Sequence, residues 1–227
     1  MKNNANKKQN FSCIITGNEE KNIKDCLQSV TWADEIIVVD SESIDNTVKI
    51  AKEFTDKVFV QKWLGYAKQK SYAISLAKNE WVISLDADER VTEALKDEIL
   101  SFNLDNTKYS AFKIKRENYF IGKKINGCGW GNDYQLRLFR KSGTRVDERL
   151  VHEKFIVEGE VAELKNPILH YSYNNLKEGF DKINVYSSLE AEEKFNKKKV
   201  STLRIIFYPV FAFLHHYLFR KGIKDGK

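Results

Sequence analysis

Two aspartates at the end of an apolar segment could bind a divalent cation. Asp86 and Asp88 follow the run Trp81–Leu85, which has the length and β-branched content of a buried strand. In an open α/β sheet, ligands bind beyond the carboxyl ends of the strands. Because two alternating carboxylates can reach one hard cation, and that cation can neutralise phosphate oxygens, we expect a metal site here. The alternative is a solvated turn in which Asp88 or Thr92 caps the next helix.

The first hundred residues alternate strand and helix signals, which predicts a parallel sheet covered by helices. Right-handed crossovers then place every strand-to-helix loop on the same edge of that sheet. Beyond Asn103 the pattern changes to mixed or antiparallel strands, interrupted by the glycine-rich loop Gly122–Asp133. The expected strands are 11–16, 35–40, 57–61, 81–86, 109–115, 135–139 and 154–157, and the expected helices are 20–30, 45–54, 66–78 and 92–102.

Polar residues after two more strands and on one helix should meet the aspartates at this edge. They are Thr16, Asn18 and Glu19 after the first strand, Asp40 and Ser41 after the second, and Gln69 and Lys70 on the third helix. Such side chains could hold a base or ribose and meet a diphosphate. Each residue alone is explained as well by a loop cap or a solvated charge, so the argument rests on their joint placement. Neither a dinucleotide-binding motif nor a P-loop motif occurs.

The composition is that of a globular protein. The 227 residues, 42% of them hydrophobic, suit one large α/β domain. The net charge of +6 fits several kinds of anionic partner, and we expect no nucleic acid among them. Three cysteines without C-x-x-C spacing favour a reducing compartment. The polar N-terminal tail, residues 1–10, is not a secretory signal, so we expect a cytoplasmic protein.

The segment Leu203–Phe219 is apolar and is followed by basic residues. It is shorter than the roughly 20 apolar residues that span a bilayer, and Arg204 and Pro209 interrupt it. These features suit a helix that lies in a membrane interface, and we expect peripheral association with the inner face of the cell membrane. The alternative is a terminal helix packed on the core.

Together these residues resemble the family-2 glycosyltransferases of the GT-A fold, in particular the bacterial branch with lipopolysaccharide-core β-glucosyltransferases. The resemblance runs from about Phe11 to the C-terminus. Its motifs are Thr16–Glu20, Trp32–Ser41, Gln69-Lys70, Leu85–Arg90, Asp133–Arg140, Val151–Glu153 and Leu169–Tyr173.

The fold implied by this resemblance is α/β: a Rossmann-like nucleotide-diphospho-sugar transferase with a mostly parallel sheet, helices on both faces and a C-terminal helical extension. The domain expected at 11–175 has a nucleotide-binding half, 11–102, and an acceptor half, 103–175. A tail, 1–10, precedes it, and a helical segment, 176–227, follows.

The same resemblance implies inverting transfer of a hexose, glucose in this branch, from a UDP-sugar to a lipopolysaccharide-core or lipid-linked glycan acceptor. Asp86 and Asp88 match the D-x-D pair that holds Mg²⁺ or Mn²⁺ against the diphosphate. Asn18, Glu19 and Asp40 match positions that surround the nucleoside.

Inversion also requires a base that deprotonates the acceptor hydroxyl. Asp133, supported by Gln135 and Arg137, is favoured over Glu153 for this role, and the alternatives are a turn cap and an ion pair. His152 and His170 are each candidates for a third metal ligand, or else hydrogen-bonded structural histidines.

Two other functions compete with glycosyl transfer. A sugar-nucleotidyltransferase would share the sheet and the acidic metal site, but Glu19 and Glu20 after the first strand would repel a triphosphate. A non-catalytic, membrane-peripheral module that binds nucleotide sugars would not need the intact acidic pair.

Overall fold

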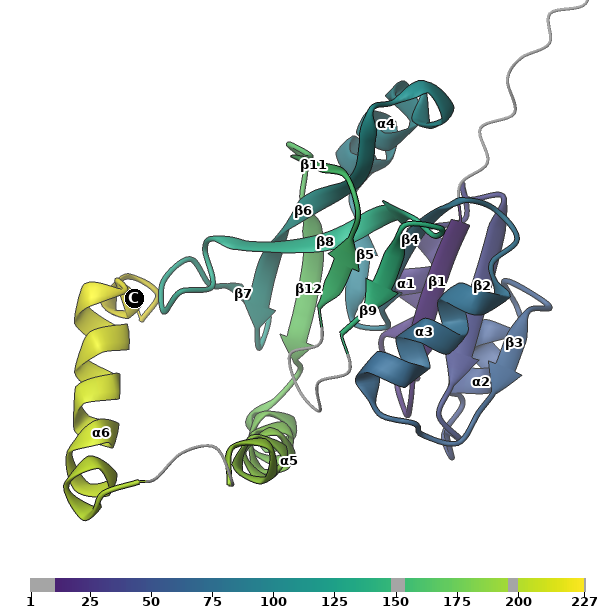
Figure 1. The fold of residues 1–227 in the computed structure, drawn as a ribbon. Helices are drawn as coiled ribbons and strands as arrows, with labels where there is room; N and C mark the ends of the chain where they lie inside the picture. The colour runs from purple at the N-terminus through teal and green to yellow at the C-terminus, as the bar shows by residue number, and fades with distance from the viewer. Residues whose placement is uncertain (1–10, 148–153, 196–199, 227) are drawn as a thin grey trace, which may run out of the picture. The chain divides into compact units, whose positions relative to one another are not determined.

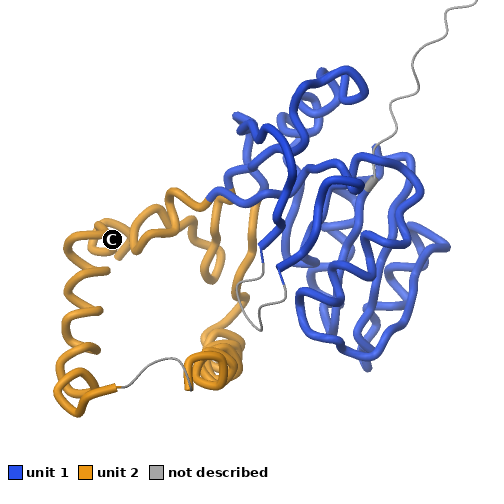
Figure 2. The backbone as a smooth tube through the Cα atoms, viewed as in Figure 1, with its two compact units in different colours: residues 1–115, 134–168 blue, residues 116–133, 169–227 orange. Residues whose placement is uncertain are grey.

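The computed structural model describes residues 11–147, 154–195 and 200–226 (Figure 1). Contacts divide the described residues into two compact units (Figure 2). The first unit holds the residues up to 115 together with 134–168. The second holds 116–133 together with 169 onward, so the glycine-rich loop groups with the C-terminal helices. The sequence-based domain boundaries remain a prediction.

The sheet of the first unit begins with four parallel strands, as the sequence predicts. Strands β3, β2, β1 and β4 lie side by side in that order, and β8 then pairs with β4 in the antiparallel direction (Figure 1). The bounds are β1 Phe11–Thr16, β2 Glu35–Asp40, β3 Val58–Val60, β4 Trp81–Asp86 and β8 Asp133–Arg140. Strand β11 (Glu160–Glu163) pairs in parallel with the first half of β6 (Tyr109–Phe120).

Helices cover both faces of this sheet, because alternate residues of each central strand point to opposite sides. On one face, Ile14 and Val38 pack in a cluster with α1. On the other, Cys13 and Ile37 pack in a cluster with α3. The predicted helix-covered parallel sheet is therefore confirmed. The helix bounds are α1 Ile23–Gln28, α2 Thr47–Ala51, α3 Tyr66–Leu76, α4 Glu93–Ser101 and the short η1 Leu104–Asn106.

Helix α4 begins where the sequence predicts a cap. The Thr92 side chain accepts a hydrogen bond from the Leu95 amide at 3.2 Å and donates one to the Pro167 carbonyl at 2.9 Å. Strand β5 (Glu89–Val91), directly after the acidic turn, was not predicted. A separate two-stranded ribbon joins β9 (Thr144–Val146) to β10 (Phe155–Val157).

The second unit is built on the other half of β6, with which β7 and β12 pair. Tyr119 and Tyr171 stack across β6 and β12 with ring centroids 5.0 Å apart. Two helices follow, then a π-helical turn and a short 3₁₀ turn. The bounds are β7 Lys123–Lys124, β12 Ile168–Tyr173, α5 Leu176–Lys194, α6 Thr202–Leu214, η2 His215–Phe219 and η3 Gly222–Lys224.

The helix formed by α6 and η2 is one continuous segment, Thr202–Phe219, of 18 residues, and none of it is buried. By length and composition alone it could cross a membrane. The expectation that this segment is too short and too interrupted to span is therefore wrong on those two criteria, since Pro209 does not end the helix.

Candidate active site

Two buried cationic side chains lie beside the acidic turn after β4. Asp86 ends the strand, and its carboxylate lies between Lys70 Nζ, 3.0 Å from Oδ1, and Arg137 Nη2, 2.8 Å from Oδ2. The side chains of both cationic residues are only 5% exposed. Asp88 is also buried. The turn is therefore an organised electrostatic site, unlike a solvated loop.

Arg137 lies beside the acidic turn, whereas the sequence suggested that it supports Asp133. Its guanidinium contacts Asp86 and the fully buried Glu89, at 2.8 and 2.5 Å. Burial alone would lower the pKa of Arg137, but the charges of Glu89 and Asp86 outweigh it and raise that pKa above its usual value. Glu89 also accepts a hydrogen bond from the Asp86 amide at 3.1 Å.

The loops after β1 and β2 lie at the same edge of the sheet, as the sequence predicts, and hydrogen bonds join them. The Asn18 amide donates to Ser43 Oγ at 2.7 Å, and Ser43 Oγ in turn donates to Asp40 Oδ1 at 2.5 Å. Thr16 pairs with Asp40 and its neighbour Ile15 with Asp86, so β1 separates the two carboxylates. The carboxyl ends of three strands therefore carry the expected residues together.

Helix α3 bridges to two of these strand ends. Gln69 is fully buried and donates from Nε2 to Ser41 Oγ at 3.2 Å, and the next residue, Lys70, pairs with Asp86. Glu19 is fixed by the Thr47 hydroxyl, which accepts a hydrogen bond from its amide at 2.8 Å. The contacts of these residues hold the loops in place, and their binding of a nucleotide remains a prediction.

Asp133 lies in the second unit with partners that the sequence did not identify. Arg116 donates from Nε and Nη2 to Asp133 Oδ2 at 2.8 and 2.7 Å, and Asn118 donates from Nδ2 to the same oxygen at 3.2 Å. Arg116 and Asn118 are two apart on β6 and so share one face, but nothing in the sequence indicates that this face meets Asp133. The guanidinium favours the ionised carboxylate that a general base requires.

His170 is held by the same asparagine. Its Nδ1 lies 2.6 Å from Asn118 Oδ1 and 3.1 Å from Ser172 Oγ. Within the part of the chain that the structure describes, no three His, Cys, Asp or Glu side chains form a metal-binding group. His170 thus has the contacts of a hydrogen-bonded structural histidine, and its role as a metal ligand stays a prediction. His152 and Glu153 lie outside the described residues.

The acidic pair fits a divalent cation in spite of this. Mg²⁺ keeps several water ligands and is commonly held by one or two carboxylates together with substrate phosphates, so no third protein ligand is needed. Asp86 and Asp88 supply two such hard oxygen donors. Lys70 and Arg137 place buried positive charge beside Asp86.

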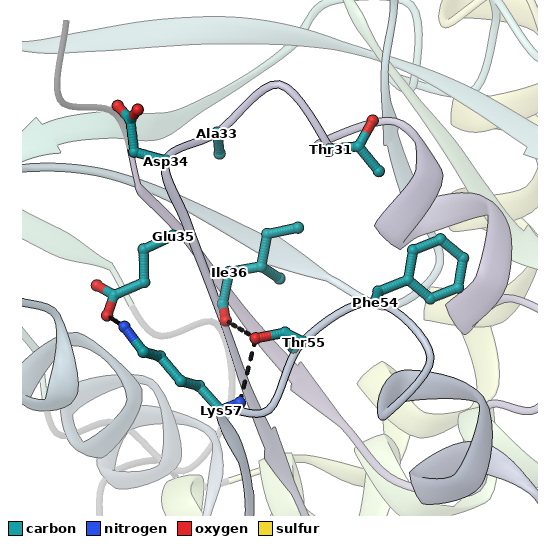
Figure 3. Close-up of a pocket in the computed structure, with 8 residues that line it drawn as sticks. All are labelled: Thr31, Ala33, Asp34, Glu35, Ile36, Phe54, Thr55 and Lys57. Atoms are coloured by element: carbon teal, nitrogen blue, oxygen red, sulfur yellow. Dashed lines mark hydrogen bonds and ion pairs between the residues drawn. The ribbon is translucent and has the colours of Figure 1, made fainter. Parts of the chain in front are cut away.

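A surface pocket of the first unit lies at the other end of β2 (Figure 3). Glu35 and Lys57 form an ion pair there, and Thr55 Oγ1 donates to the Ile36 carbonyl at 2.8 Å. The pocket faces the amino ends of β2 and β3, whereas open α/β sheets bind ligands at the carboxyl ends. It is therefore separate from the acidic turn.

Comparison with known proteins identifies the chain. Residues 12–155 match the family model described as glycosyl transferase family 2. The chain belongs to glycosyltransferase family 2. An uncharacterized glycosyltransferase of Rickettsia typhi, RT0209, is 34% identical over 94% of this chain and 77% of the relative. The lipopolysaccharide core biosynthesis glycosyltransferase LpsC of Rhizobium meliloti is 30% identical over 92% of this chain and 80% of the relative.

A solved structure supports the same fold for this family-2 glycosyltransferase. The crystal structure of S. aureus TarS 1-349 aligns with a TM-score of 0.50 at 17% identity, over 81% of this chain and 66% of that one. The predicted GT-A architecture and the enzyme class, a glycosyltransferase, are therefore confirmed, and the non-catalytic alternative loses its support.

Proposed function

We propose that this glycosyltransferase transfers a hexose, glucose in the first instance, from a UDP-sugar to a lipopolysaccharide-core or lipid-linked glycan acceptor, with inversion and with Mg²⁺ or Mn²⁺. The observation that carries the proposal is the pair Asp86 and Asp88 beside the buried cations Lys70 and Arg137. The similarity to LpsC, at 30% identity, supports the acceptor class.

On the donor side, Asp86 and Asp88 would hold the cation, which neutralises charge on the leaving diphosphate. Each Asp86 oxygen lies beside a cationic side chain, Lys70 on one side and Arg137 on the other. Lys70 and Arg137 orient Asp86 and raise the local positive potential. The joined loops that carry Asn18 and Asp40 would surround the nucleoside.

On the acceptor side, Asp133 is the proposed base. The acceptor oxygen attacks the anomeric carbon, the bond from that carbon to the diphosphate oxygen breaks, and the hydroxyl proton passes to the Asp133 carboxylate. Arg116 and Asn118 hold this carboxylate at one oxygen before the reaction. Attack from the face opposite the leaving group gives inversion.

The identity of the released product tests this function against nucleotidyl transfer. Wild-type protein with a panel of UDP-sugars and Mn²⁺ is expected to release UDP, fastest with UDP-glucose, and to bind UDP in calorimetry more tightly with Mn²⁺ than with EDTA. Release of pyrophosphate from UTP and a sugar phosphate would instead support the nucleotidyltransferase. An affinity for UDP that is the same with Mn²⁺ as with EDTA would count against the metal site.

We also propose that helix Thr202–Phe219 attaches the enzyme to the membrane surface. At about 100° per residue in α6, and somewhat less in the π-helical turn, one half of the circumference carries only apolar and aromatic side chains, while Arg204, His215 and His216 lie on the other half. An exposed helix with one such face suits a membrane interface, with Arg220 and Lys221 at its end near anionic headgroups. The apolar face consists of Leu203, Ile206, Phe207, Val210, Phe211, Phe213, Leu214, Tyr217 and Leu218, all exposed.

Two adjacent isoleucines offer a matched test of this attachment. Ile206 lies on the apolar face and Ile205 on the opposite one, and they are 58% and 65% exposed. Ile206→Asp is expected to weaken binding to anionic vesicles at least about tenfold, because inserting an isoleucine contributes about 1.5–3 kcal/mol. Ile205→Asp is expected to change it little. Co-sedimentation with vesicles measures both variants.

Equal losses in the two isoleucine variants would contradict a helix lying in the interface. Resistance of the wild-type protein to alkaline extraction would point instead to a spanning helix.

A further inference from the structure

The C-terminal turn is bonded to the glycine-rich loop that precedes Asp133. The Asp225 carboxylate accepts hydrogen bonds from two successive backbone amides, those of Asn126, at 3.1 Å, and Gly127. Lys123 Nζ donates to the Asp225 carbonyl at 2.6 Å. All of these residues belong to the second unit. A carboxylate across consecutive amide groups is a strong, charge-assisted arrangement.

Further contacts extend this connection along the C-terminal turn. The Cys128 amide donates to the Arg220 carbonyl at 2.8 Å, and His216 Nδ1 lies 3.1 Å from the Cys128 carbonyl. The two segments also pack closely: a Cβ added at Gly222 would lie 2.5 Å from Cys128 Sγ, and one at Gly127 would lie 2.6 Å from an Asp225 oxygen. Residues 216–225 and 123–128 thus form one unit of structure, which we call the C-terminal clip.

The loop connects the clip to the proposed base through three hydrogen bonds. Within it, the Trp130 amide donates to the Gly127 carbonyl at 2.9 Å. The Trp130 carbonyl then accepts from Asn118 Nδ2 at 3.1 Å, and the same Nδ2 lies 3.2 Å from Asp133 Oδ2. The Asn118 amide group therefore contacts both Asp133 and the backbone of the loop.

A glycine-rich loop needs such an external attachment. Gly122 and Gly129 have φ angles of 75° and 90°, and Cys128 has a φ of 55°, so the loop bends through left-handed conformations at these three residues. Glycine segments lose more conformational entropy on ordering than other residues do. Contacts outside the loop must offset this cost, and the clip provides them.

We propose that Asp225 is a positioning residue for catalysis: through the clip it fixes the loop before Asp133 and so holds the Asn118–Asp133 pair in its reactive arrangement. This inference rests on the proposed function, in which Asp133 is the base. Asp225 acts through the loop backbone and needs no contact with substrate.

Two variants open the clip in different ways. Asp225→Ala removes the carboxylate that binds the two amides. Gly222→Ala leaves every charge in place but adds a methyl group against Cys128 Sγ and the His216 carbonyl, 2.9 Å away. The matched controls are Asp181→Ala, at an exposed position on α5, and Gly226→Ala, where a Cβ would meet no atom closer than 3.7 Å.

Cys128 is a native reporter of clip opening. Cys13 and Cys26 are buried, and burial raises the pKa of the Cys13 thiol to about 12 and that of Cys26 further still, so neither should react with a disulfide reagent in the folded protein. Cys128 is partly exposed beneath Gly222. Its rate of reaction is expected to rise at least about fivefold in both opening variants. Asp225→Ala loses two charged hydrogen bonds, and Gly222→Ala adds a methyl group that does not fit beside Cys128 Sγ.

The kinetic result separates positioning from a merely structural role. In both opening variants, kcat for UDP release from UDP-glucose is expected to fall about tenfold, while KM for UDP-glucose and the calorimetric Kd for UDP with Mn²⁺ stay at wild-type values. Asp225→Asn retains one acceptor oxygen and is expected to give an intermediate kcat. The controls keep wild-type kcat and wild-type Cys128 reactivity.

Four results would overturn the inference. The first two are an unchanged Cys128 rate in Asp225→Ala and a faster Cys128 rate with unchanged kcat. The third is a fall in kcat accompanied by a loss of UDP affinity or of the cooperative thermal transition. The fourth is full activity in Asp133→Asn. The last of these alone would also remove the proposed base. Full kcat in the opening variants beside an inactive Asp133→Asn would remove only the clip.

Discussion

The Asp88→Ala variant is expected to lose about a hundredfold to a thousandfold in kcat for UDP release, with its fold intact. Loss of one carboxylate from the proposed metal-binding pair would leave the charge that develops on the diphosphate without its main stabilisation, and single electrostatic contributions of this kind are worth about 10²–10³ in rate. Calorimetry should then show the same UDP affinity with Mn²⁺ as with EDTA. Asp105→Ala, at an exposed position of the first unit, is the control and should behave as wild type.

A contrast within the same turn strengthens this test. If Asp88 serves the metal, the free energy of unfolding without metal should change less in Asp88→Ala than in a variant of its neighbour Glu89. Glu89→Gln, in contrast, leaves the buried Arg137 with a single carboxylate partner and is expected to destabilise the protein by about 3 kcal/mol, as measured in urea. Manganese-dependent UDP binding that survives in Asp88→Ala would reject the metal assignment.

Local signals were enough to predict the parallel half of the fold. Strand β2 is apolar from Ile36 to Val39 and wholly buried, and its end at Asp40 was predicted to the residue. Parallel strands with right-handed crossovers bring their carboxyl ends together, which is why Asp40 and Asp86 could be expected on either side of β1. The contact of Lys70 with Asp86 follows from the same topology, because α3 crosses back over β1.

The electrostatic partners could not be predicted, because they come from distant parts of the chain. Arg137 reaches the acidic turn only because β8 turns back antiparallel beside β4, and nothing in its local pattern distinguishes a buried arginine from a surface one. Arg116, whose side chain is 19% exposed, is paired with Asp133 only because β6 and β8 lie side by side. The contact of Asp225 with Gly127 joins residues 98 positions apart. Such contacts depend on tertiary geometry, about which a single sequence says little.

The Asp133→Asn variant is expected to lose about 10²–10⁴ in kcat, the usual contribution of a positioned general base, with UDP affinity in Mn²⁺ unchanged. Asparagine is nearly isosteric, and its amide oxygen can still accept the hydrogen bonds from Arg116. The loss would therefore reflect the missing proton acceptor, with the loop still in place. Release of UDP from UDP-glucose measures kcat, and the thermal unfolding transition confirms that the variant folds.

Glu153→Gln decides between the two candidates for the base. If Asp133 takes the proton, Glu153→Gln keeps most of the wild-type kcat. Asn118→Ala should then lose about tenfold, because its Nδ2 orients Asp133 at 3.2 Å without accepting the proton. The reverse pattern, with Asp133→Asn active and Glu153→Gln inactive, would transfer the role of base to Glu153. Asp133 would then have a structural role only. Its contacts with Arg116 and Asn118 are also those of a structural ion pair, which would stabilise the start of β8.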